Sequence, residues 1–232
     1  MWKTLSAGMA AALVASAGFC VSLSDTEERW LKGVMPVITF AREINLPLDI
    51  VVQPQPTPGA APLAMAFQDG RCKLVFSMRD NPEAHATLER IAPDMRDAAL
   101  ELMAAHELGH CKRYLEGAWH VLPSGFVQRP GVGGSMQPEL QAAVLAMTAA
   151  RREEGFADLV GLAWIRQRHP RMYATLYAWL VRERSSDLIT GSHHDTLVWL
   201  RQVADGAALQ GRSIFAEAAS VWEDGLGADN RP

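Results

Sequence analysis

Two histidines and a glutamate within a five-residue stretch are the part of this chain best equipped for chemistry. His106, Glu107 and His110 form the pattern H-E-x-x-H. On a helix, residues i and i+4 share one face, with Cβ atoms about 5–6 Å apart, a separation that two ligands of a tetrahedral zinc ion can span. The glutamate between them then lies beside the metal, where it can act as a base. The pattern therefore predicts a helix that carries two zinc ligands.

The third ligand of such a site must come from elsewhere in the chain. Catalytic zinc has three protein ligands and one open position. The extended pattern with a third histidine would need a glycine and a histidine where Arg113 and Glu116 stand. Glu154 is the best candidate, because it lies on the inward stripe of the next long predicted helix, from which Glu153 points about 100° away. Glu153 and then Asp158 are the alternative ligands.

Two further residues would support catalysis at this zinc. Asp158, one turn beyond Glu154, is placed to accept a hydrogen bond from the ring nitrogen of His106 that does not bind the metal. Zinc lowers the pKa of its bound water from 15.7 to about 7. Glu107 would take the proton of that water and pass it to the leaving amine. The chemistry expected here is the hydrolysis of a peptide bond.

An oxyanion that develops during such a reaction needs a donor in addition to the metal. His193 or His194 is the predicted donor, and Tyr173 and Tyr177 are weaker candidates. The alternative for the two histidines is an exposed polar loop that caps the following helix. His120 lies past the predicted end of the zinc helix and is interpreted as a loop residue.

Hydrophobic periodicity, caps and breakers predict the elements that position these residues. Ser24 to Glu27 looks like a capping box, and Asp69-Gly70 is typical of a tight hairpin. The predicted helices cover 24–43, 93–116, 138–168, 170–184, 196–204 and 213–223, and the predicted strands cover 48–52, 63–68 and 71–78. This layout predicts an α+β fold: a mainly helical domain with a small antiparallel sheet before the H-E-x-x-H helix. The H-E-x-x-H motif itself makes the domain resemble a zincin.

The predicted helix 138–168 carries two acids on a stripe that should be apolar. Its inward stripe repeats at three- and four-residue steps. Buried carboxylates need a partner such as a metal or a histidine. The Pro/Gly-rich connection 120–137 before this helix is long enough to border the cleft. The stripe consists of Leu140, Val144, Met147, Glu154, Asp158, Gly161 and Ile165.

Composition and the N-terminus restrict the class of protein. The 232 residues are 49% apolar and carry a net charge of −4, so no basic surface for nucleic acid is expected. Lys3, an uncharged Ala-rich stretch and Ala15-Ser16-Ala17 are typical of a signal peptide over 1–20, with cleavage after Ala17 or Cys20. Residues 21–232 are then expected to form one exported domain, periplasmic or secreted, without a membrane span.

In an oxidising compartment, two states are possible for Cys72 and Cys111. Cys72 and Cys111 can form a disulfide that ties a predicted strand to the zinc helix. They can equally remain two buried thiols.

The motifs resemble those of a known family. H-E-L-G-H followed by E-G-F-A-D, from Glu154 to Asp158, is similar to the gluzincin pattern HExxH…ExxAD, and most similar to the CAAX-prenyl-protease type with its heat-shock membrane proteases and soluble periplasmic relatives. The resemblance covers roughly residues 60–205. It implies that Glu154 is the third zinc ligand, that Asp158 supports a ligand histidine, and that substrates lie along a strand edge.

Three functions are compatible with these residues. The first is an exported zinc metallopeptidase that acts on peptide or protein substrates. The second is a binding protein in which zinc only clasps two helices together, and the third is a zinc amidase that acts on cell-wall peptides. Three good ligands favour catalysis, because structural zinc is usually four-coordinate and rich in cysteine.

Overall fold

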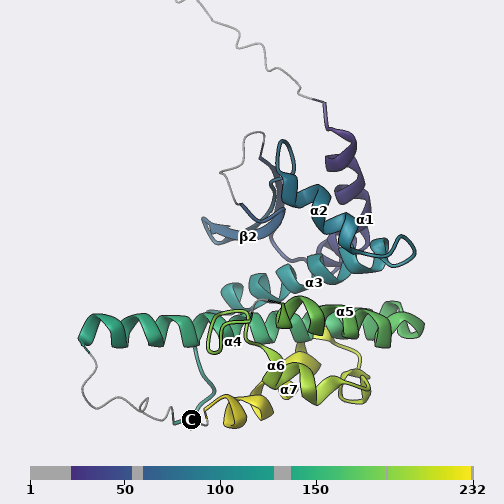
Figure 1. Cartoon of the computed structure of the whole chain (residues 1–232). Helices are drawn as coiled ribbons and strands as arrows, with labels where there is room; N and C mark the ends of the chain where they lie inside the picture. Colours follow the sequence, from purple (N-terminus) through teal and green to yellow (C-terminus); the bar gives the residue numbers. More distant parts are fainter. Residues whose placement is uncertain (1–21, 54–59, 128–136, 187, 231–232) are drawn as a thin grey trace, which may run out of the picture.

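Helices dominate the structure, and a small sheet lies at one end of it (Figure 1). The computed structural model describes residues 22–53, 60–127, 137–186 and 188–230. The predicted signal peptide and much of the predicted loop 120–137 lie outside these residues. The sheet, α1 and α2 form one layer, α3 crosses beneath them, and α4 and α5 separate α3 from α6 and α7 (Figure 1). The predicted α+β, mainly helical class is confirmed.

The first helix is the one that the sequence predicts. α1 (Asp25–Glu43) begins with a capping box in which the Ser24 hydroxyl accepts from the Glu27 N–H, and the Glu27 carboxylate accepts from the Ser24 N–H. This reciprocal pair satisfies two backbone donors that the first turn leaves open. The buried face of α1 packs on α3. Its apolar members are Trp30, Val34, Val37, Ile38 and Ala41.

The sheet is mixed, which corrects the predicted antiparallel sheet. Its order is β1 (Leu48–Val52), β3 (Arg71–Phe76), β2 (Leu63–Gln68). β2 and β3 form the predicted hairpin, and both turn residues, Asp69 and Gly70, have the positive φ that a tight hairpin needs. Because the chain reverses in this hairpin after crossing from β1, β3 runs parallel to β1. β2 is thereby an edge strand, with its outer edge toward the helices of the site.

The helix that carries H-E-x-x-H begins later than predicted, and a short helix before it was not predicted. α2 (Pro82–Arg90) begins with Asn81 as its cap. α3 (Arg96–Leu115) starts after a turn in which the Met95 N–H donates to the Ala92 carbonyl, so Pro93 belongs to this turn. A disulfide between Cys72 of β3 and Cys111 of α3 joins the sheet to the helix, which decides between the two alternatives for these cysteines.

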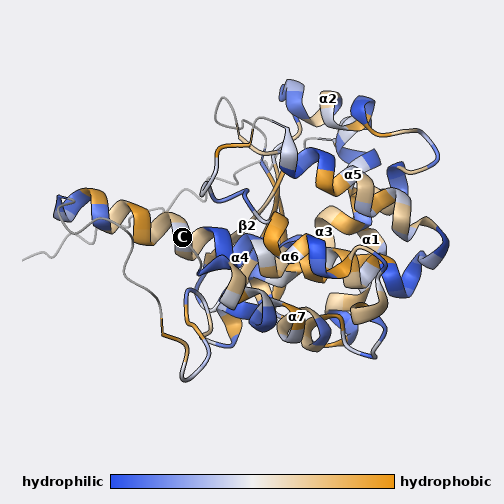
Figure 2. Cartoon of the chain, turned by 60° about the horizontal axis from the view of Figure 1, so that its bottom comes forward, coloured by the Kyte–Doolittle hydropathy of each residue, from blue (hydrophilic) through white to orange (hydrophobic). Residues whose placement is uncertain are grey.

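α4 (Pro138–Arg168) has the predicted bounds but only half of the predicted burial. Its buried residues run from Arg152 to Ile165. The apolar stripe of the first half is exposed, since Leu140 and Val144 have 55% and 44% of their surface accessible. Figures 1 and 2 show why: this half extends beyond the rest of the molecule. The expectation of one inward stripe along the whole helix is therefore wrong for residues 138–147.

Glycines allow α3 and the buried half of α4 to approach closely. A Cβ on Gly109 would lie 2.9 Å from the Cα of Ala157, and a Cβ on Gly161 would lie 3.0 Å from the carbonyl oxygen of Leu102. Real Cβ atoms essentially never show the first distance, and the second is tighter than nine in ten real Cβ contacts. Gly109 lies between the two histidines of the pattern, so this close approach is what brings α4 to them.

The C-terminal helices cover the other side of α4. A 3-10 turn (Pro170–Met172) leads into α5 (Tyr173–Ser185), and α7 (Ile214–Asp229) extends beyond its predicted end at 223. The predicted helix 196–204 is the short α6 (Leu197–Leu200) followed by a 3-10 turn. Among the described residues, no helix has both the length and the apolar character needed to cross a membrane.

Candidate metal centre

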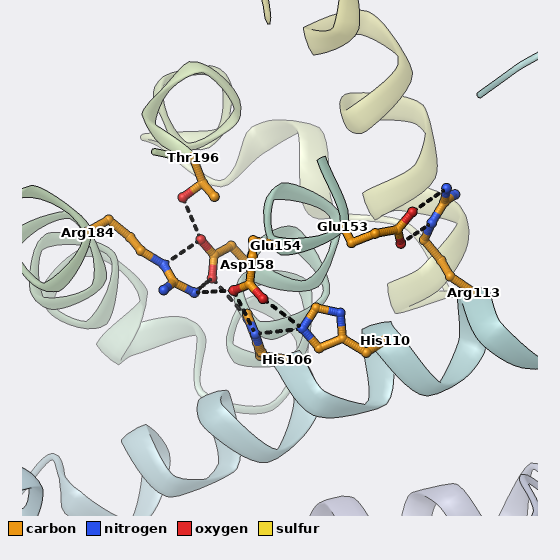
Figure 3. Close-up of polar contacts among 8 residues, drawn as sticks. All are labelled: His106, His110, Arg113, Glu153, Glu154, Asp158, Arg184 and Thr196. Carbon is orange, nitrogen blue, oxygen red and sulfur yellow. Dashed lines mark hydrogen bonds and ion pairs between the residues drawn. The ribbon is translucent and has the colours of Figure 1, made fainter. Parts of the chain in front are cut away.

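His106 and His110 of α3 and Glu154 of α4 point toward one another (Figure 3). The Nε2 atoms of the two histidines lie 3.1 Å apart. The Glu154 carboxylate oxygens lie 3.5 Å from Nε2 of His106 and 3.4 Å from Nε2 of His110. The three predicted ligands therefore form one triangle of side chains, in which each histidine faces a different oxygen of Glu154.

The size of this triangle fits a tetrahedral ion. With metal–ligand bonds of about 2.05 Å, two ligands of a tetrahedral zinc are about 3.3 Å apart, whereas octahedral angles at the same bond length would bring them to about 2.9 Å. The observed separations, 3.1 Å between the nitrogens and 3.4–3.5 Å from them to the two carboxylate oxygens, lie around the tetrahedral value. Two imidazoles and one carboxylate are also ligands that zinc accepts at a catalytic site.

Asp158 sets the tautomer of His106. Its Oδ1 lies 3.0 Å from Nδ1 of His106, and its side chain is fully buried. Because an ionised carboxylate only accepts hydrogen bonds, a neutral His106 carries its proton on Nδ1. The lone pair of Nε2 is then directed into the triangle, which is the state that a metal requires. Burial lowers the pKa of His106, but Asp158 and Glu154 raise it overall, so without a metal the ring readily takes up a second proton. The role that the sequence predicted for Asp158 agrees with this geometry.

Two residues that the sequence analysis missed hold Asp158 in place. Arg184 of α5 donates from Nε to Oδ2 at 2.8 Å and from Nη2 to Oδ1 at 2.6 Å, and the Thr196 hydroxyl donates to Oδ2 at 2.6 Å (Figure 3). Nη2 of Arg184 also lies 3.3 Å from Glu154. No motif marks either residue, because Arg184 lies on α5 and Thr196 directly precedes α6, and both meet Asp158 only in the folded chain.

These neighbours keep the carboxylates ionised. Burial alone would raise the pKa of Glu154, but the hydrogen bond from His110 and the positive charges of the two histidines and Arg184 lower it to about 2. Burial likewise opposes ionisation of Asp158, and Arg184 and His106 more than offset it, so that its pKa lies well below the usual range. Glu154 thus has the charge that a metal ligand needs.

Glu153, the alternative ligand, belongs to a different cluster. Arg113 donates to it from Nε at 2.6 Å and from Nη2 at 3.0 Å, and the backbone N–H of His120 donates to it at 2.8 Å. Figure 3 shows this pair pointing away from the triangle. Glu153 therefore anchors the loop after α3, and His120 takes part through its backbone, as expected of a loop residue.

A cavity of about 520 Å³ opens onto the triangle. Glu107 lines it together with all three predicted ligands. Burial raises the pKa of the Glu107 carboxyl above its ordinary value, and the positive charge of the histidines opposes the rise only in part. A carboxylate of raised pKa is a stronger base near neutral pH. Glu107 therefore shares the cavity with the three candidate ligands and has a raised pKa there.

Only one of the predicted oxyanion donors reaches this cavity. His194 lines it, and burial followed by the nearby charges of Arg184 and His193 lowers the pKa of His194. His193 stacks against His194 at 4.0 Å between ring centres but is not among the lining residues. The hydroxyl of Tyr173 donates to the Val203 carbonyl away from the cavity, and Tyr177 does not line it either.

The edge of the sheet and the loop after α3 complete the cavity wall. Residues of β2 and the segment before it lie on one side, and Trp119 lies beside His110, with ring centres 5.5 Å apart. Trp119 also packs on Phe67 of β2. The described part of the predicted bordering loop, 120–127, does not line this cavity, and its remainder lies outside the described residues.

Comparison of the chain with protein-family models, with curated proteins and with solved structures gives no match. A function can therefore be inferred only from the motifs and from the geometry of these side chains.

Proposed function

We propose that the protein is a zinc-dependent metallopeptidase, a hydrolase of peptide bonds. The observation that carries the proposal is the triangle of His106, His110 and Glu154 with Glu107 in the same cavity. Three ligands leave the fourth position of a tetrahedral ion open for catalysis. The resemblance of the two motifs to gluzincins supports the same activity.

In the proposed mechanism, the metal, Glu107 and His194 have separate roles in hydrolysis. Bound zinc would supply a Lewis acid that activates water and polarises the scissile carbonyl. Glu107 accepts the proton of the attacking water and delivers it to the leaving amine. His194, which its lowered pKa keeps neutral near pH 7, has an N–H to offer to the developing oxyanion.

The charges of the site favour a divalent cation. Glu107, Glu154 and Asp158 contribute three negative charges when ionised, and Arg184 contributes one positive charge. With neutral histidines, a Zn²⁺ ion brings the sum to zero. Buried charge is tolerated only when it is compensated in this way. The net charge of the ligand set and Arg184 therefore matches a divalent ion such as zinc better than a proton or a monovalent ion.

A peptide is the substrate that the cavity fits best. β2 is an edge strand, and residues of β2 and of the preceding segment line the cavity. An extended peptide can add to such an edge through main-chain hydrogen bonds. This would lay its backbone across the zinc position. A peptide chain also carries the amide carbonyl that a zinc hydrolase polarises.

Export of the protein is part of the proposal. The Cys72–Cys111 disulfide is buried between β3 and α3, and disulfides of this structural kind persist in oxidising compartments. Together with the signal-like residues 1–20, the disulfide supports a periplasmic or secreted protein.

Zinc content and peptide hydrolysis, measured on the same preparations, test the proposal. About one zinc per chain is expected in the wild type and in Glu107→Gln, but not in Glu154→Ala. Hydrolysis of casein and of cell-wall stem peptides should fall about 10²–10⁴-fold in Glu107→Gln. If the wild type binds zinc but hydrolyses these substrates no faster than Glu107→Gln, the result favours the binding protein in which zinc only clasps two helices. Cleavage of stem peptides alone would favour the amidase. The absence of zinc from the wild type after reconstitution would refute all three.

A further inference from the structure

One section of the cavity is apolar and lies about one helical turn from the candidate metal centre. On α3, Leu102 and Met103 precede His106 and Glu107 by four residues. On α5, Leu180 precedes Arg184 by the same interval, next to Trp179. Four residues along a helix correspond to about 6 Å. Two helices therefore present a polar layer at the metal position and an apolar layer beside it.

Trp30 of α1 joins these residues, and we call the five of them the apolar subsite: Trp30, Leu102, Met103, Trp179 and Leu180. All but Met103 have 6% or less of their surface exposed, and Met103 is partly buried. The charged residues at this part of the lining, Arg90 and Glu183, are exposed and lie at its rim. The interior of the subsite thus carries no formal charge.

The two tryptophans of the apolar subsite differ in their indole N–H groups. That of Trp179 is buried and has no hydrogen-bond partner among the described residues. The Trp30 N–H, by contrast, donates to the Ala84 carbonyl. A buried donor without a partner is costly, and such groups are rare in folded proteins.

We propose, on the basis of the proposed function, that the apolar subsite receives a large apolar side chain next to the scissile bond. The enzyme would then select peptides with leucine, methionine or phenylalanine at that one position. Burying such a side chain is worth about 10–100-fold in affinity over alanine. A lysine or aspartate side chain would lose its hydration there without gaining a partner, and it should be rejected at least as strongly as glycine.

Met103 is the residue to vary, because it is the only partly buried member of the subsite and it binds no metal. Met103→Trp should fill the subsite, and Met103→Ala should enlarge it. Met147, on the exposed half of α4 and 42% accessible, provides the matched controls Met147→Trp and Met147→Ala. Zinc content of each variant shows that the metal centre is intact.

The measurement is calorimetric binding of blocked peptides to zinc-loaded Glu107→Gln protein, so that it does not depend on turnover. The peptides are identical except for glycine, alanine, leucine, phenylalanine, lysine or aspartate at each position in turn. We expect one position at which leucine and phenylalanine bind about 10–100-fold more tightly than alanine. Met103→Trp should abolish this preference, Met103→Ala should shift it toward phenylalanine, and the Met147 variants should leave it unchanged.

Two results would overturn the inference. One is the absence of any position with an apolar preference. The other is a preference that Met103→Trp and Met147→Trp alter equally. The proposed function fails separately, through loss of zinc binding or through hydrolysis that does not depend on Glu107. A protein that binds apolar peptides without cleaving them would retain the apolar subsite and lose only the peptidase activity.

Discussion

The two halves of α4 have the same apolar periodicity but different surroundings. Residues 152–165 lie between α3 and α7 and are almost all buried. Residues 138–147 extend beyond the body of the molecule, and their leucine, valine and methionine side chains are 42–55% exposed (Figure 2). The hydrophobic pattern of a helix therefore predicts which face could be buried. Whether that face is buried depends on the elements that pack against it.

The buried half also holds several charged residues, whereas Glu139 is the one charged residue of the exposed half, 138–147. Arg152, Glu153 and Asp158 are buried, and Glu154 is mostly so, while residues 140–150 contain no charged side chain at all. Each buried acid has a cationic or histidine partner on another helix. Charge can thus enter the core of this protein because distant residues compensate it. The predictions below compare a change in one half with a matched change in the other.

Removal of the carboxylate ligand should have the largest effect. Glu154→Ala is expected to weaken zinc binding by more than about 100-fold, since even residues that only support a ligand contribute 10–100-fold. Glu139→Ala, in the exposed half, should leave the affinity unchanged. Competition with a chromogenic chelator measures both. Equal zinc affinity in the two variants would remove Glu154 from the ligand set.

Loss of Asp158 should destabilise the protein strongly. Asp158→Ala leaves Arg184 and His106 without their buried acceptor, and uncompensated buried charges of this kind cost about 3–5 kcal/mol in the free energy of unfolding. Gln141→Ala in the exposed half should change it by less than about 0.5 kcal/mol. Urea unfolding at pH 7 gives both values. A small effect of Asp158→Ala would mean that water replaces the carboxylate.

Acid should destabilise the metal-free protein through the same carboxylates. The pKa of Glu154 is about 2 in the folded chain against an ordinary 4.5, and that of Asp158 is also lowered. The unfolded chain therefore binds more protons as the pH falls, so the stabilisation is complete above about pH 4.5 and is lost toward pH 2. Asp158→Asn should show a shallower loss than the wild type in unfolding measured over this range. Glu139→Gln should follow the wild-type curve.

The close packing of the buried half gives a smaller, steric effect. A Cβ on Gly155 would lie 2.4 Å from the indole ring of Trp199. Gly155→Ala should therefore cost about 1–3 kcal/mol, although alanine favours a helix. Ala143→Leu, in the exposed half, adds more atoms yet should stay within about 0.5 kcal/mol. Thermal unfolding distinguishes the two, and a stabilising Gly155→Ala would show that Trp199 can move.

The smallest effect is expected where the apolar stripe is exposed. The double variant Leu140→Gln, Leu145→Gln removes two large apolar side chains, yet neither is part of the buried core. Its free energy of unfolding should stay within about 1 kcal/mol of the wild type. Leu159→Ala, in the buried half, should cost about 2–5 kcal/mol. A similar loss in the double variant would mean that residues 138–147 are covered in solution.

Local signals account for the parts of the fold that the sequence predicted well. The capping box of α1, the bounds of α4 and the Asp69-Gly70 hairpin each depend on residues within a few positions of one another. The start of α3 was predicted too early for the same reason, because Pro93 suits both the first turn of a helix and the turn that precedes one. The parallel pairing of β1 with β3 has no local signal, since it follows from how the chain crosses the sheet.

By itself, the sequence determined most of the helices, the class of the fold and the presence of two histidines one turn apart with a glutamate between them. These properties follow from backbone periodicity, which any short stretch carries. Only the tertiary structure decided that Glu154 faces those histidines, that Arg184 and Thr196 hold Asp158, and which half of α4 is buried. Such contacts join residues 26 to 52 positions apart, and what brings them together is the packing of whole helices, with Gly109 and Gly161 allowing the approach.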